Sequence, residues 1–87
     1  MVDYKKIGMR IRKQRNEKGL SQELLAEKAE VSLSFIGHIE RGTRVLSVET
    51  LARLCQVLEM DMHYIVFGYS SAEKGLLSDL KELLQKY

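Results

Sequence analysis

Apolar residues recur at intervals of three and four along most of this chain, which is the spacing of one face of an α-helix. Ile7 and Ile11 begin the pattern, within a stretch from about residue 3 to residue 18. Asp3 precedes that stretch and can cap it, and Gly19 follows it as a residue that tolerates the left-handed backbone of a helix end. The pattern therefore predicts a first helix with a defined start and end.

Three further helices are predicted by serine residues that stand just before apolar stretches. Ser21, Ser32 and Ser47 can each accept a hydrogen bond from the first turn of a helix. A loop over residues 43–46 separates the second of these helices from the third. The side chains expected to face inward are Leu24, Leu25 and Ala29, then Phe35, Ile36 and Ile39, then Val48, Leu51, Leu54, Cys55 and Leu58.

The remaining pattern predicts a short fifth helix over residues 62–67, ended by Gly68, and then a last helix. Ser70 and Glu73 have the spacing of a capping box, in which each side chain bonds to the other residue's backbone amide. The last helix would carry an apolar stripe made of Leu76, Leu77, Leu80, Leu83, Leu84 and Tyr87. Helices should thus cover well over half of the chain, and the predicted fold class is all-α.

The composition agrees with one small helical domain. The chain has 87 residues, 45% of them hydrophobic, and it has no proline. Such a length supports one compact domain with a thin core, so association with a second copy is expected. Residues 1–19 carry a net charge of +5 and the rest of the chain −3. A basic first helix could face phosphates, or it could simply be solvated.

Few residues suited to catalysis or metal binding are present. The single cysteine, Cys55, excludes a disulfide framework and a multi-cysteine zinc site within one chain, and it is expected to be a small buried residue. Two separated histidines and no glycine-rich phosphate loop argue against an enzyme, a metal site and a cofactor, and His63 is expected at the surface. No apolar stretch is long enough for a signal core or a membrane span, which predicts a cytoplasmic protein without a membrane partner.

Residues 21–40 have the features of a helix-turn-helix. Such a motif needs a small residue in its first helix, a tight turn, and apolar residues that set the angle between the two helices. Ala26 is the small residue, and residues 29–32 form the turn that leads to the cap at Ser32. The joining apolar residues are Leu25, Ala29, Val31, Ile36 and Ile39. These features together predict a helix-turn-helix rather than an ordinary helical hairpin.

Over about residues 7–67 the chain resembles the Cro/repressor-type helix-turn-helix family, also called the xenobiotic-response-element-like family. The segments that carry the resemblance are residues 11–15, 19–29, 31–32, 35–36, 39–42 and 47–51. It implies a compact five-helix lambda-repressor-like DNA-binding domain over residues 1–68 and an additional C-terminal helix over 69–87. Glu30 stands where the family usually has glycine, and Leu46 where it often has proline. The missing proline is shared with restriction–modification controller proteins and favours that subset.

The resemblance also implies roles for residues in and around the motif. A recognition helix over about residues 32–41 would enter the major groove, with base contacts from Leu33, Ser34, Gly37 and His38. Phosphate contacts are expected from Gln22, Arg41, Thr43, Arg44 and Thr50. Arg15 and Glu40 would form a partly buried salt bridge. Because the base-facing set has no Arg, Asn or Gln for bidentate hydrogen bonds, DNA shape should contribute to recognition.

The resulting prediction is a sequence-specific transcriptional regulator that binds double-stranded DNA as a homodimer at an inverted-repeat operator. A two-fold dimer interface is expected from Met62, Val66, Phe67, Leu77, Leu80 and Leu84. In one alternative, the last helix instead folds back over its own core. In another, the chain is a protein-interaction module that kept the fold, such as an antitoxin whose partner is a toxin protein.

Overall fold

The computed structural model describes residues 2–69 and 71–86, with the side chains of residues 71–74, 77 and 86 outside the description. Its helices are α1 (Tyr4–Glu17), α2 (Gln22–Ala29), α3 (Leu33–Arg41), α4 (Val48–Leu58), α5 (Met62–Phe67) and α6 (Ser71–Lys86). The described part of the chain has no strand. The all-α prediction is therefore confirmed, and the helices begin and end close to the expected residues.

Polar side chains start the helices in the way the sequence indicates. Asp3, Ser21, Ser32 and Ser47 each accept a hydrogen bond from the backbone amide three residues later. A cap of this kind stabilises a helix by about 1 kcal/mol. Asp61 caps α5 as well, with its carboxylate accepting from the amide of His63, and the apolar pattern alone did not indicate that cap.

Two helices end on acidic residues in the left-handed conformation. Glu30 follows α2 with φ 58° and ψ 43°, and Glu59 follows α4 with φ 53° and ψ 47°. A residue with a Cβ is strained there by about 1–2 kcal/mol relative to its usual conformations. Glu30, which stands where the family usually has glycine, thus adopts a conformation that favours glycine, and Glu59 does the same at a position the sequence did not mark.

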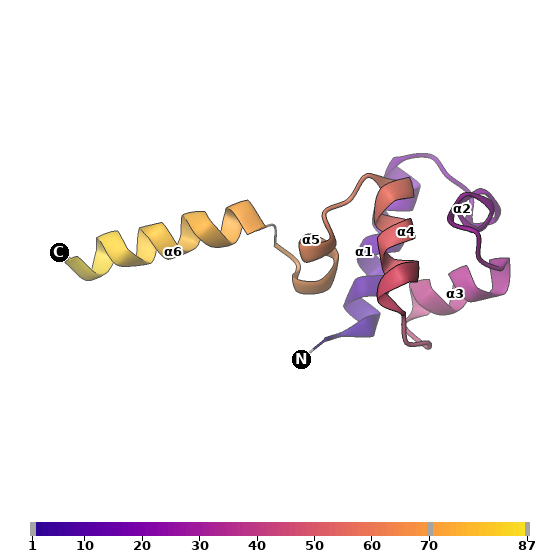
Figure 1. The fold of residues 1–87 in the computed structure, drawn as a ribbon, viewed down its shortest axis with the longest axis horizontal. Coiled ribbons are helices and arrows are strands. Elements are labelled where there is room, and N and C mark those ends of the chain that lie inside the picture. Colours follow the sequence, from indigo (N-terminus) through magenta and orange to yellow (C-terminus); the bar gives the residue numbers. More distant parts are fainter. Residues whose placement is uncertain (1, 70, 87) are drawn as a thin grey trace.

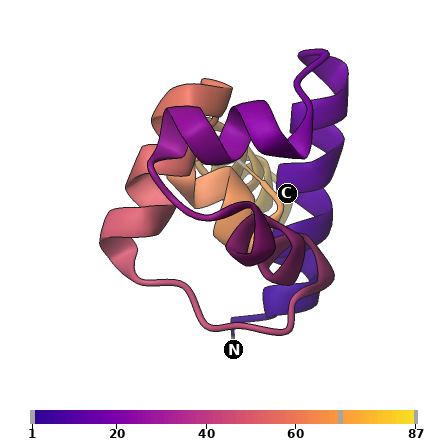
Figure 2. The same cartoon turned by 90° about the vertical axis from the view of Figure 1, so that its right-hand side faces the viewer.

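The core joins the first five helices. In Figure 1, α2 and α3 form the end of the molecule opposite α6, and Figure 2 shows α1 on one side and α4 on the other side of this end. Helix α1 contacts α3, α4 and α5, and α2 contacts α3 and α4. The largest fully buried side chains are Ile11, Leu25, Ile36, Ile39, Leu54, Leu58 and Ile65. This core fixes the angle between α2 and α3.

Two residues expected to face inward are exposed instead. The side chain of Leu24 is 37% exposed and that of Val48 is 75% exposed. Leu24 lies about 100° around α2 from Leu25, which occupies the buried face. Val48 is the first residue of α4, and its side chain projects to solvent at the end of that helix. Both were predicted to be buried because they are apolar, although the buried face of α2 is formed by Leu25, Ala26 and Ala29.

A glycine permits the close crossing of α1 and α3. A Cβ atom added to Gly8 would clash with the carbonyl oxygen of Ile39 and would lie 2.7 Å from that of Glu40. Since the obstructing atoms are backbone, no side-chain movement could relieve the clash. Gly8 therefore sets how deeply α3 packs on α1, and the sequence pattern gave no indication of this role.

Helix α6 projects away from the body formed by α1–α5 (Figure 1). The molecule consequently extends 53 Å along its longest axis and only 24 by 19 Å across. The leucines of its apolar stripe are exposed at Leu76, Leu80, Leu83 and Leu84. The alternative in which α6 covers the core is therefore not what the structure adopts. The proposed capping box at Ser70 and Glu73, the side chain of Leu77, and Tyr87 lie outside the described residues. Among the described residues, no helix is both long and apolar enough to cross a membrane.

Candidate nucleic-acid interface

A buried ion pair holds α3 against α1. Arg15 donates from Nε to Oε2 of Glu40 at 2.7 Å and from Nη2 to Oε1 at 3.1 Å. Its Nη1 also donates to the carbonyl oxygen of Leu20 at 2.8 Å. Only 11% of the Arg15 side chain and 3% of the Glu40 side chain are exposed. The expected salt bridge is present, and its bidentate geometry fixes the direction in which α3 points.

Gln22, expected to contact a phosphate, also belongs to this network. Its Nε2 donates to Oε1 of Glu40 at 3.1 Å, and the side chain is half-buried. An amide nitrogen has two hydrogens, so one N–H of Gln22 remains available to a phosphate. The sequence did not indicate this hydrogen bond to Glu40, which orients the Gln22 side chain at the start of α2.

The base-facing residues predicted on α3 differ in accessibility. Leu33 is 46% exposed and Ser34 is also exposed, whereas His38 is half-buried. Gly37 is buried, although it lies on the outward side of α3. The structure therefore brings Leu33, Ser34 and His38 to one accessible face and leaves Gly37 covered.

His38 is held by Thr43, a residue predicted to contact phosphate. The Thr43 hydroxyl donates to the carbonyl oxygen of His38 at 3.2 Å and lies 2.8 Å from Nδ1 of the same residue. A hydroxyl has one hydrogen, so with that hydrogen on the carbonyl it accepts a bond from Nδ1–H. In the neutral ring this leaves Nε2 as an outward-facing acceptor, suited to the amino group of adenine or cytosine.

The remaining phosphate candidates surround the loop between α3 and α4. Arg41 and Arg44 are exposed, and neither forms an ion pair within the described part of the chain. Thr50 lies in the first turn of α4, where Ser47 Oγ donates to its hydroxyl oxygen at 3.0 Å. That bond leaves the hydroxyl hydrogen of Thr50 available to an anion. Two arginines and one helix start therefore stand beside the exposed face of α3.

Several basic side chains of residues 1–19 make internal contacts instead of facing solvent. Arg10 donates from Nη1 to the carbonyl oxygens of Ile65 and Val66, at 2.7 and 3.2 Å. Lys18 pairs with Glu59 at 3.4 Å, and Arg15 belongs to the buried pair. The positive charge of this segment thus serves packing to a large extent, and the net charge of +5 overstates what is available to phosphates.

The predicted dimer residues lie on two different helices. Met62 and Val66 of α5 are half-buried and pack against the core. Phe67 is 56% exposed, and on α6 Leu80 is 47% and Leu84 79% exposed. The described side chains of this set do not form one patch, because α6 departs from the body after α5 (Figure 1).

His63, expected at the surface without partners, is half-buried beside two aromatic rings. Its ring centroid lies 4.7 Å from that of Phe67 and 5.3 Å from that of Tyr69. Its Nδ1 lies 2.8 Å from the carbonyl oxygen of Tyr69, which can only accept, so Nδ1 carries the hydrogen. The histidine therefore ties down the segment that leads to α6.

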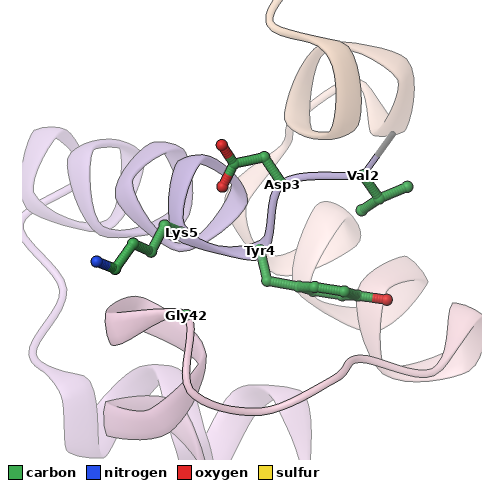
Figure 3. Close-up of a pocket in the computed structure, with 5 residues that line it drawn as sticks. All are labelled: Val2, Asp3, Tyr4, Lys5 and Gly42. Atoms are coloured by element: carbon green, nitrogen blue, oxygen red, sulfur yellow. The ribbon is translucent and has the colours of Figure 1, made fainter.

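Other chemistry is sparse in the described residues. Cys55 is buried, as expected, and burial raises the pKa of its thiol, with a smaller contribution from Asp61. No group of three or more metal-ligating side chains occurs in the described residues. A shallow hollow of about 460 Å³ opens at the start of α1, lined by Val2, Asp3, Tyr4, Lys5 and Gly42. Figure 3 shows the Lys5 amino group extending away from the Tyr4 ring, so this hollow does not gather a reactive set.

Comparisons with known proteins point to one family. A family model described as "Helix-turn-helix" matches residues 11–65. The regulator RamB of Mycobacterium tuberculosis, named an HTH-type transcriptional regulator, is 36% identical over 77 residues. That match covers 88% of this chain and 16% of RamB, so the chain corresponds to about a sixth of that relative's length.

Solved structures show the same architecture. The restriction–modification controller protein C.AhdI from Aeromonas hydrophila is 36% identical, with a TM-score of 0.69, covering 72% of this chain and 96% of that one. SinR, an HTH-type transcriptional regulator of Bacillus subtilis solved in complex with DNA, is 40% identical, with a TM-score of 0.65. That match covers 68% of this chain and 95% of the SinR chain. Both matches confirm the expected lambda-repressor-like fold.

Proposed function

Because this chain belongs to the helix-turn-helix family, we propose that it is a sequence-specific DNA-binding transcriptional regulator whose helix α3 enters the major groove. One observation carries the proposal: α3 exposes Leu33 and Ser34, while the Arg15–Glu40 pair holds its opposite side against α1. A rigid helix with one free face is what base reading in the groove requires. The likeness to SinR, solved with DNA, supports the proposal.

Phosphate contacts should fix the position of α3 on the duplex. Arg44 lies in the loop that follows α3, α2 packs against α3, and the starts of α2 and α4 present backbone amides to anions. Gln22 adds one N–H at the start of α2. Such contacts carry affinity without reading sequence, since every phosphate looks alike.

Salt dependence tests the phosphate contacts. Replacing Arg44 with alanine should lower affinity for all duplexes and make the slope of log K against log salt shallower by about 0.9, since one counterion release is lost. Binding of fluorescent duplexes should be measured from low to moderate salt, with Lys81→Ala as the control, an exposed basic residue on α6. An unchanged slope in Arg44→Ala would remove Arg44 from the phosphate-binding set.

We further propose that two copies bind an inverted repeat. Recognition helices of such dimers enter successive major grooves, about 34 Å apart on one face of the duplex. Since α6 projects from the end of the molecule opposite α2 and α3, two copies joined through α6 direct both α3 helices to the same end when their α6 helices pair in parallel (Figure 1). An antiparallel pairing would direct the two α3 helices toward opposite ends of a particle more than 53 Å long.

A second candidate function is the binding of another protein, as in an antitoxin. The exposed leucines of α6 favour it, because an apolar helix face suits a foreign protein as well as a second copy. Sedimentation of the pure protein with and without random duplex at low salt separates the two functions. Failure to bind any duplex would favour the interaction module.

A further inference from the structure

Gly37 is buried because the side chain of Arg41 lies over it. A Cβ atom added to Gly37 would be 3.0 Å from Nη1 of Arg41, 3.6 Å from Nη2 and 3.7 Å from Cζ. The contacting atoms all belong to the guanidinium group. The guanidinium therefore lies against the point at which any other side chain at position 37 would begin, and a Cβ there would require it to shift.

Helix geometry explains this position. Residues four apart lie one above the other on a helix, and side chains lean toward the helix N-terminus. Arg41 follows Gly37 by four residues and Ser34 by seven, so all three lie along one line of the outward face of α3. The missing side chain at Gly37 lets the guanidinium lie back along that line, toward the part of α3 that would read bases. Its position differs from that of a side chain reaching outward from the helix end to a phosphate.

The guanidinium is also free to bind. Arg41 is exposed, and within the described part of the chain it takes part in no ion pair and no hydrogen bond through its side chain. By contrast, Arg10 and Arg15 are both engaged internally. A guanidinium presents parallel N–H donors that match the O6 and N7 acceptors of guanine in the major groove.

We propose that Arg41 forms hydrogen bonds to a guanine. Gly37, which has no side chain, leaves the space that lets the guanidinium lie on the base-reading face of α3. The inference rests on the proposed function and replaces the expected phosphate role of Arg41. It also supplies what the predicted base-facing set lacked, namely a bidentate donor. Leu33, Ser34 and His38 would then contact neighbouring bases.

Base analogues test the proposal directly. Duplexes are first selected from a random pool by the wild-type protein, and each guanine is then replaced in turn by 7-deazaguanine, which lacks N7. At one position the replacement should weaken wild-type binding, within the about 5- to 150-fold that a bidentate pair contributes. In Arg41→Ala that penalty should fall toward onefold, because alanine has no side-chain donor for the guanine. Arg44→Ala is the matched control and should keep the full penalty.

The role of Gly37 is tested by Gly37→Ala, which retains Arg41. Its Cβ at 3.0 Å from Nη1 requires the guanidinium to move, while alanine favours the helix more than glycine does. The 7-deazaguanine penalty should therefore fall while the circular dichroism stays unchanged. Persistence of the penalty in Arg41→Ala would overturn guanine reading by Arg41, and persistence in Gly37→Ala would overturn the role of Gly37. A shallower salt slope in Arg41→Ala that keeps the penalty would then identify a phosphate contact. Failure of the wild-type protein to select any duplex would overturn the proposed function itself.

Discussion

At the scale of single residues, the buried Arg15–Glu40 pair is the main polar contact that holds α3 against α1. Four hydrogen bonds converge there, since Gln22 and the carbonyl of Leu20 join the two charged groups. A buried pair adds little net stability over apolar residues of similar size, but removing one partner leaves an uncompensated charge. The pair therefore specifies the orientation of α3 more than it stabilises the fold.

Arg15→Ala should accordingly destabilise the protein by about 3–5 kcal/mol, because Glu40 would stay buried without its partner. Urea denaturation followed by circular dichroism measures the loss. Arg53→Ala is the matched control, since the Arg53–Glu49 pair has side chains 36% and 76% exposed. Its removal should change the stability by less than about 1 kcal/mol. Equal losses in the two variants would contradict the role given to burial.

At the scale of helices, the ends of α2 and α4 are the weak points. Both end on glutamates in the left-handed conformation, and helix α2 leads directly into the turn of the helix-turn-helix. The amides of Val31 and Met60 nonetheless bond back to the carbonyl oxygens of Ala26 and Cys55 at 3.0 and 2.9 Å. Both turns are thus well formed despite the residue type.

Glu30→Gly should stabilise the protein by about 0.5–1 kcal/mol, since removal of the strain exceeds the greater entropy of an unfolded glycine. The same unfolding measurement applies. Glu27→Gly serves as control, because a glycine inside α2 should cost about 1 kcal/mol. A loss of stability in Glu30→Gly would mean that the side chain makes a favourable interaction that outweighs the strain.

Much at this scale followed from the sequence. Caps at Ser21, Ser32 and Ser47 and the inward positions of Leu25, Ile36 and Ile39 are local consequences of residue type and spacing. The errors arose where a residue's surroundings come from elsewhere in the chain. Val48 lies at the edge of the buried face of α4, and Leu24 lies nearly opposite the buried face of α2. His63 meets partners that only the fold brings near it.

At the scale of the whole molecule, two surfaces lie at opposite ends. The exposed face of α3 belongs to the end formed by α2 and α3, and α6 projects from the other side (Figures 1 and 2). Helix α6 is also separate from the core of α1–α5. Changes on α6 should therefore affect association without unfolding the body.

Leu80→Asp combined with Leu83→Asp should abolish dimer formation, because a charge in an apolar helix pair is unpaired and desolvated. Sedimentation equilibrium should show the wild-type protein as a dimer and the variant as a monomer, with the urea midpoint of the body measured in parallel. Ser78→Asp and Lys81→Asp, at exposed positions beside the stripe, are the controls. A wild-type monomer at all concentrations would remove α6 as a dimer interface.

The sequence by itself determined the helices, their caps, the core-facing residues of the helix-turn-helix and the family, because each depends on neighbours within one or two helical turns. Only the tertiary structure determined which polar groups form hydrogen bonds with one another and where α6 lies. In the folded chain Gln22 bonds to Glu40, Arg10 bonds to a backbone carbonyl of α5, and α6 does not pack on the core. These outcomes depend on contacts between helices distant in the chain. The position of Arg41 over Gly37 is intermediate, since the four-residue spacing is local but the glycine's burial became visible only in three dimensions.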